Sequence, residues 1–279
     1  MIVSTNILEE LFQEFTEFLK AISGENFVSF KTSAYIDEQE NYKYSIYREA
    51  KRQTGSKDWK PEDIGTGKIQ KSVDSAILKK VIHNGKTEDN NLIYWMQKDN
   101  FSKLKTDKNL EQLFFDFYKN KIPPQKAFQE FTQYFDYQFI AYLFFINNKD
   151  QFLSISQKVF DNIISEKLHI PDLKTSGNVS WENYKTFIEI IKEVHRFLRT
   201  KDKNAELLDA HSFLWILGKQ REAWLSELNS NQKNSLIKNE SFERRVSKVS
   251  KESSQSGLAK DDKAHNETKK VVEPVNNFV

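Results

Sequence analysis

The residues with the clearest potential for chemistry are an acid and a Glu-x-Lys triplet, formed by Asp37, Glu49 and Lys51. In restriction-type nucleases two carboxylates hold Mg²⁺ and a lysine lies near the attacked phosphate, with these side chains on adjacent strands. Residues 42–46 alternate like a strand, but the run to Arg52 fits a helix equally well. Glu-x-Lys triplets are also common in a chain this rich in charge, so the competing interpretation is a solvated helix face.

A second group of polar residues lies inside the apolar run 207–217, which contains Asp209, His211 and Ser212. Residues that are two positions apart on a helix point to different faces, so Asp209 and His211 cannot chelate one ion together. No Gly-x-Ser-x-Gly elbow surrounds Ser212. We expect its hydroxyl to bond a carbonyl one turn back along the helix.

His211 shares a helix face with Trp215, and both side chains should be buried. Because an unpaired buried charge is costly, we expect a neutral His211 that is bonded to a backbone carbonyl or to a carboxylate of another helix. The alternative is a ligand site completed by distant acids such as Glu182 or Glu189. His195 lies beside two arginines and is expected on an exposed basic face.

Tryptophans are a third source of candidates, because an indole ring can stack on a base in single-strand and flipped-base pockets. Four of them come into question: Trp95, Trp181, Trp215 and Trp224. Aromatic residues at helical spacing usually belong to a core, which is the alternative for all four. As candidate binding residues we retain Trp181, His211 and Trp215.

The segment Gly65-Thr66-Gly67-Lys68 invites comparison with a phosphate-binding loop. That motif needs a glycine five residues before the Gly-Lys pair and a Ser or Thr after the lysine. Glu62 and Ile69 hold those positions here. A glycine turn before a helix is the better interpretation.

The hydrophobic pattern predicts that helices position most of these residues. Gly24 and Gly218 should end the first and the last of the helices, and Ser180 should cap another. Apolar residues recur at helical spacing over residues 4–22, 68–82, 110–118, 123–135, 156–168, 180–198 and 205–217, and the apolar run 92–96 should begin a further short helix.

Three further segments complete the predicted fold. Residues 139–146 are apolar on all sides, and their flanks favour a buried helix. Residues 27–47 fit short strands as well as a helix, and residues 85–91 should form a polar loop. We therefore expect a mainly α chain, with a single large multi-helix domain over residues 1–228 and a small β element near residues 27–47 as an open alternative.

Residues 229–279 differ from the rest in composition. They carry 10 Lys/Arg and 7 Asp/Glu, and their large apolar residues are isolated. A helical extension to about Ser247 is an open alternative, but residues 247–279 cannot bury enough apolar surface to offset the entropy lost on ordering. We expect a polar, mildly basic, largely disordered C-terminal tail.

Composition also limits the classes of protein to which the chain can belong. It has 279 residues and no cysteine, which excludes disulfides, thiolate metal sites and cysteine nucleophiles. Residues 1–228 carry 32 basic and 33 acidic residues, so their net charge indicates neither a strongly basic nucleic-acid-binding body nor a membrane surface. The longest apolar run is far shorter than the roughly 20 residues of a membrane helix. We expect a cytoplasmic protein without membrane contact, metal or cofactor.

Four sequence blocks resemble a family of uncharacterised bacterial proteins that is associated with restriction, defence and mobile-element neighbourhoods. The blocks are Ser180-Trp-Glu-Asn-Tyr184, the run 207–217, Asp89-Asn-Asn-Leu-Ile-Tyr-Trp95 and Ala141-Tyr-Leu-Phe-Phe145. The resemblance covers most of residues 1–228. It implies a nucleic-acid or defence context, and it transfers no catalytic residues.

These observations lead to one hypothesis and two alternatives. The hypothesis is a non-catalytic DNA-recognition or accessory module of a bacterial restriction or defence system, with DNA or a partner protein of that system as its partner. The first alternative is a metal-dependent nuclease that uses Asp37, Glu49 and Lys51. The second is a plain protein–protein interaction domain.

Overall fold

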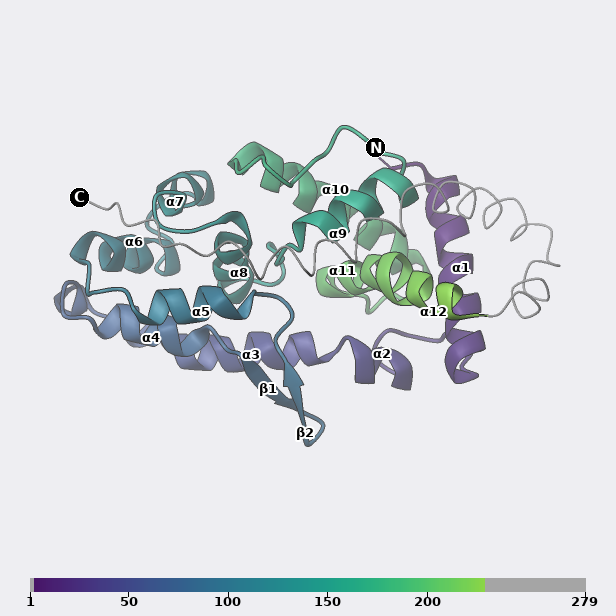
Figure 1. The fold of residues 1–279 in the computed structure, drawn as a ribbon, viewed down its shortest axis with the longest axis horizontal. Coiled ribbons are helices and arrows are strands. Elements are labelled where there is room, and N and C mark those ends of the chain that lie inside the picture. The colour runs from purple at the N-terminus through teal and green to yellow at the C-terminus, as the bar shows by residue number, and fades with distance from the viewer. Residues whose placement is uncertain (1–2, 229–279) are drawn as a thin grey trace, which may run out of the picture. The chain divides into compact units, whose positions relative to one another are not determined.

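The computed structural model describes residues 3–228 and shows them to be mainly helical, as predicted (Figure 1). Among the described residues, those up to Glu222 form one compact unit, and a second unit begins at Ala223. The tail predicted over residues 229–279 lies outside the described residues. Within residues 3–228, no helix is both long enough and apolar enough to cross a membrane.

The elements follow one another in a simple order. The first part of the chain holds α1 (Thr5–Ser23), α2 (Ala34–Gln39), α3 (Tyr42–Thr54), η1 (Ser56–Asp58), η2 (Pro61–Asp63), α4 (Lys68–Ala76), β1 (Lys80–His83) and β2 (Lys86–Asp89). The middle holds α5 (Trp95–Ser102), α6 (Lys108–Tyr118), α7 (Pro124–Phe131), α8 (Tyr137–Asn147), α9 (Gln157–Asn162) and the π-helical turn η3 (Ile163–Lys167). The last described elements are α10 (Trp181–Lys201), α11 (Leu207–Trp215), the π-helical turn η4 (Ile216–Arg221) and α12 (Glu222–Glu227).

Helix α8 forms the centre of the core, and residues 139–146 are buried as predicted for a helix that is apolar on all sides. Rings from other helices surround it. Phe117 of α6 lies 4.6 Å from Phe144, and Tyr184 of α10 lies 5.8 Å from the same ring. Centroid distances of this size are typical of favourable aromatic pairs.

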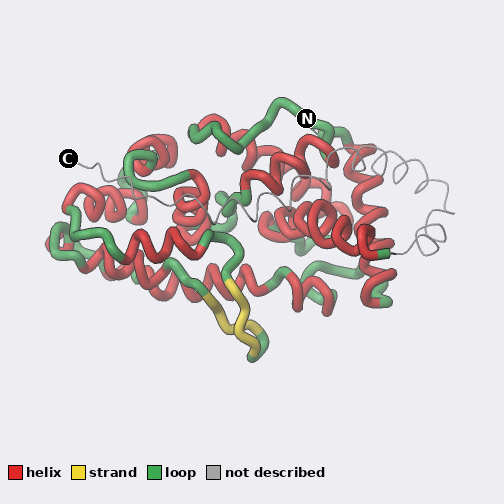
Figure 2. The backbone as a smooth tube through the Cα atoms, viewed as in Figure 1, coloured by secondary structure: helices red, strands yellow, loops and turns green. Residues whose placement is uncertain are grey.

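Of the two alternatives for residues 27–47, the β element is wrong, because that segment contains α2 and the first part of α3 and no strand. The described residues contain one antiparallel hairpin, β1–β2, in which Val81 pairs with Glu88 (Figure 2). Its turn places Asn84 and Gly85 at positive φ angles of 48° and 76°. An Asn-Gly pair between two short strands is the strongest short hairpin signal in a sequence. Residues 85–91 were expected to form a loop, but this signal places β2 within them.

The predicted caps have different outcomes. Ser180 caps α10 by accepting a 3.2 Å hydrogen bond from the backbone N–H of Asn183, and Gly24 ends α1 in the left-handed conformation, as predicted. Gly218 does not end the last long helix. The chain continues through it as η4, and a Cβ atom at Gly218 would lie 2.1 Å from a side-chain carbon of Ile163. This glycine therefore permits the close packing of η4 against η3.

Helix α3 connects the regions discussed below. It packs against α4, β1 and α8 along its length. Its two ends consequently contribute side chains to different environments.

Candidate nucleic-acid interface

The candidate nuclease residues Asp37, Glu49 and Lys51 are not assembled on adjacent strands. Asp37 lies on α2 and accepts a 2.6 Å hydrogen bond from the Asn84 amide. The other two residues lie two positions apart on α3, so they point to different sides and line different cavities. The helical alternative was correct, and the strand geometry that this nuclease chemistry needs is not formed.

Each of the two α3 residues has its own partner. Glu49 accepts hydrogen bonds of 2.8 and 2.6 Å from Arg52, which together with Gln53 lowers the pKa of its carboxyl to about 2. The Lys51 ammonium donates a 2.6 Å hydrogen bond to the backbone carbonyl of Asn147. No group of three or more potential metal ligands was found among residues 3–228.

The Gly65–Lys68 turn holds an internal anion. The backbone N–H groups of Gly65 and Gly67 donate to one oxygen of Glu111, at 2.7 and 3.1 Å. The other oxygen accepts from the backbone N–H of Gln70 at 2.8 Å. A carboxylate of α6 thus fills the start of α4, where a phosphate loop would bind its ligand. The glycine turn before a helix is confirmed.

A buried polar cluster joins the start of α3 to α11 and η4, and we define it by Glu40, Lys43, His211 and Ser212. Glu40 and Lys43 are each 2 % exposed, and the Lys43 ammonium donates to the Glu40 carboxylate. It also donates to the Ser212 hydroxyl at 3.3 Å, and Gln220 donates to the second Glu40 oxygen at 2.8 Å. Ser212 therefore faces the Glu40–Lys43 pair. The predicted bond from its hydroxyl to a carbonyl one turn back is replaced by this contact.

His211 is buried, as predicted. It is 2 % exposed, and burial together with the charge of Lys43 lowers its pKa well below the ordinary value. The ring bonds the Ser154 backbone carbonyl, and its Nδ1 lies 3.5 Å from the Lys43 ammonium. Asp209 faces a different side, where it accepts a 2.7 Å hydrogen bond from Tyr44. The separation of Asp209 from His211 is confirmed.

The outcome for His195 is different. It is half-buried rather than exposed, and its Nε2 lies 2.8 Å from the carbonyl oxygen of Ala205. The loop that returns from α10 to α11 supplies this carbonyl. The contact between His195 and Ala205 joins a helix to a loop, so the hydrophobic periodicity of the sequence does not indicate it.

The two retained tryptophans have structural surroundings. Trp181 is half-buried and lies 6.0 to 6.1 Å from the rings of Phe128 and Phe144. Trp215 is half-buried rather than fully buried, and its ring lies 5.6 Å from the Lys43 ammonium. The cavity beside Trp215 and His211 has a volume of about 10 Å³. That volume holds about one water molecule and cannot hold a base.

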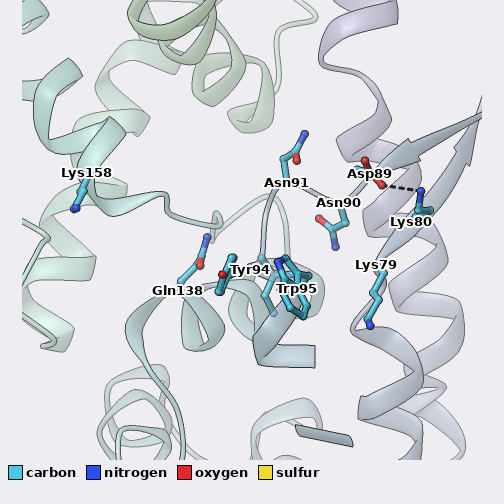
Figure 3. A pocket seen from close by; sticks show the side chains of 10 residues that line it. Lys79, Lys80, Asp89, Asn90, Asn91, Tyr94, Trp95, Gln138 and Lys158 are labelled. Atoms are coloured by element: carbon cyan, nitrogen blue, oxygen red, sulfur yellow. Dashed lines mark ion pairs between the residues drawn. The ribbon is translucent and has the colours of Figure 1, made fainter. Parts of the chain in front are cut away.

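Trp95 lies in very different surroundings, in a surface groove of about 1130 Å³ (Figure 3). Tyr94 and Trp95 stand next to each other at the start of α5, with their ring centroids 5.7 Å apart. Their side chains are 49 % and 56 % exposed. We call this the Tyr94–Trp95 groove; the other residues that the argument uses are Lys79, Lys80, Gln138 and Lys158.

Lysines enter this groove from separate elements. Lys79 directly precedes β1, Lys80 is the first residue of that strand, and Lys158 comes from α9 (Figure 3). Lys80 pairs with Asp89 at 3.1 Å and Lys79 with Asp99 at 2.6 Å. Ion pairs this exposed contribute little to stability, so a phosphate can replace the carboxylate at little cost. Lys158 forms no ion pair within residues 3–228.

The sequence contained a signal that could have separated Trp95 from the other tryptophans. Tyr94, Trp95 and Met96 are consecutive, and successive residues of a helix point about 100° apart. Three large apolar side chains at a helix start cannot all face one core. All three are in fact exposed.

Searches against protein-family models, curated proteins and solved structures gave no significant match.

Proposed function

We propose that this chain is a non-catalytic nucleic-acid-binding module, used for DNA recognition or as an accessory component of a bacterial restriction or defence system. The observation that carries the proposal is the Tyr94–Trp95 groove, where two exposed rings lie among lysines. Aromatic rings contribute about 1–3 kcal/mol per stacked base. Lysines beside them neutralise phosphates and release counterions.

The rings also define the form of nucleic acid that fits. A base can stack on a side chain only after it has left the duplex stack. Gln138 of α8 presents an amide to the same groove, where it can bond a base edge. We therefore propose single-stranded DNA, or DNA with an unstacked base, as the ligand.

Other features support a binding role over the nuclease alternative. Asp37, Glu49 and Lys51 point to separate places, and Glu49 is already neutralised by Arg52. The defence context has a different source, the resemblance of the four sequence blocks. It is therefore a proposal that stands apart from the groove.

Fluorescence anisotropy with a labelled 20-nucleotide single strand and the matching duplex tests the proposal. Trp95→Ala should weaken single-strand binding by about 5- to 100-fold, the loss expected for one stacked base. Tyr134→Ala removes an exposed ring outside the groove and is the matched control. Equal affinities of the two variants would overturn the groove as the interface. Mg²⁺-dependent cleavage that Glu49→Ala abolishes would overturn the non-catalytic assignment.

A further inference from the structure

A second concave site lies at the opposite end of α3 from the buried polar cluster. It has a volume of about 900 Å³ and receives a lysine from each of four positions. Lys51 comes from the end of α3, Lys57 from η1, and Lys119 and Lys121 from the connection between α6 and α7. We call it the four-lysine pocket. It shares no lining residue with the Tyr94–Trp95 groove.

The positive charge of this pocket is not balanced by the described part of the chain. No acidic side chain of residues 3–228 lines the pocket, and none of the four lysines forms an ion pair within that range. Asp150 is paired with Lys149, which does not line the pocket, and Asp116 accepts a hydrogen bond from Gln112.

The lysines are held in place by neutral groups. Lys51 donates to the Asn147 carbonyl at 2.6 Å, and Lys119 donates to the Lys57 carbonyl at 2.8 Å. The Lys121 ammonium lies 4.4 Å above the ring of Phe115. Burial of Lys51 and the charge of Lys57 lower the pKa of the Lys51 ammonium. These contacts orient the ammonium groups and leave their charges unmatched.

The backbone of the loop that carries two of the lysines is restrained by its local conformation. Asn120 has a positive φ of 55°, and the backbone N–H of Lys121 donates to the Asp116 carbonyl at 2.7 Å. Pro123 and Pro124 follow after Ile122 and restrict the backbone further. A rigid loop lowers the entropy lost when its lysines bind a ligand.

We propose that the four-lysine pocket binds two or more linked phosphate groups. Four unpaired ammonium groups match the charge of a diphosphate, whereas a lone carboxylate would neutralise only one of them. Lysine binds phosphate as a point charge and does not require the planar geometry of a carboxylate–arginine pair. The phosphates can belong to a small phosphorylated molecule or to a nucleic-acid backbone, which share this chemistry.

Isothermal titration of the full chain with sodium pyrophosphate, at constant ionic strength, tests the proposal. The variant Lys57→Ala/Lys121→Ala removes two exposed lysines, which should spare the fold. Its affinity for pyrophosphate should fall by about tenfold or more, the loss of charge-assisted hydrogen bonds. Lys126→Ala/Lys192→Ala removes two exposed lysines outside the pocket and should bind like the wild type. Equal affinity of both double variants, or no more binding than with sulfate, would overturn the proposal.

Competition with the labelled single strand separates the two sources of phosphate. If pyrophosphate displaces the strand and the Lys57/Lys121 variant binds both ligands weakly, the phosphates are those of the nucleic acid. If pyrophosphate binds without displacing it, they belong to a separate small molecule. Trp95→Ala should leave pyrophosphate binding unchanged in both cases, so failure of the proposed function and failure of this inference give different results.

Discussion

Two lysines of α3 differ in how their burial is compensated. Lys43, near the start of the helix, is as buried as a core residue and is matched by Glu40. Lys51, near its end, is half-buried, bonds a neutral carbonyl and has Lys57 as a second positive charge beside it. Removing a charge from water is costly unless an opposite charge accompanies it. The charge of the first lysine is therefore matched within the fold, whereas the second is one of the four lysines that we propose bind phosphate.

The difference shows that burial of a charged residue does not by itself identify a functional site. In the sequence, the buried polar cluster is the stronger candidate for catalysis, because it contains a histidine and a serine. Its groups are satisfied by one another, and the cavity beside it has room for about one water molecule. The four-lysine pocket contains neither a histidine nor an acid, yet its charges lack partners in the described chain.

The largest expected effect is loss of the Lys43 charge. Lys43→Met leaves the Glu40 carboxylate buried without its partner and should destabilise the fold by about 3–5 kcal/mol. Lys51→Met removes an unmatched charge and should change stability by less than about 1 kcal/mol. Urea unfolding of both variants at pH 7 measures the difference. Similar losses would mean that the two lysines are not distinguished by their partners.

A second variant controls for the lost packing of the Lys43 side chain. In Glu40→Gln/Lys43→Met neither charge of the buried pair remains, so much of the stability lost in Lys43→Met should return. A double variant as unstable as Lys43→Met would assign the loss to packing instead.

A smaller effect should appear in the pH dependence of stability. Burial and the charge of Lys43 lower the pKa of His211 below its ordinary value of 6.5. The unfolded chain then binds a proton more readily, so the stability that His211 contributes is present above pH 6.5 and is lost as the pH falls toward its lowered pKa. Between pH 7.5 and 5.5 the wild type should lose about 1.4 kcal/mol more than His211→Asn. Parallel stability curves for the two proteins would contradict a buried, neutral His211.

The sequence predicted the helices better than the sites, for physical reasons. Helical spacing, the Ser180 cap and the Gly24 stop are local signals, and the fully apolar run 139–146 had to be surrounded by other elements. The four-lysine pocket brings together the ends of α3 and α8 and the connection after α6. These segments are far apart in the sequence, so no local sequence pattern predicts that they come together. The role of Gly218 likewise depends on Ile163 of another helix.

The smallest effect tests the unmatched charge directly. The lowered pKa of Lys51 means that its protonated form is disfavoured in the folded chain. The stability that this group contributes is therefore present above its ordinary pKa of 10.5 and lost as the pH falls through the lowered value, so the folded chain carries the cost at pH 7.

The variant Lys57→Ala removes one cause of the lowered Lys51 pKa, the neighbouring positive charge. It should stabilise the fold by about 0.3 kcal/mol at low salt, the size of a like-charge pair near a surface. Salt of about 0.5 M should erase the gain, because screening then acts within a few ångströms. With pyrophosphate present, the wild type should be more stable than Lys57→Ala, since a ligand gives more stability to the protein that binds it more tightly. Thermal unfolding of Lys57→Ala beside Lys192→Ala measures all three conditions, and a loss of stability in Lys57→Ala at low salt would show that the pocket is already neutralised.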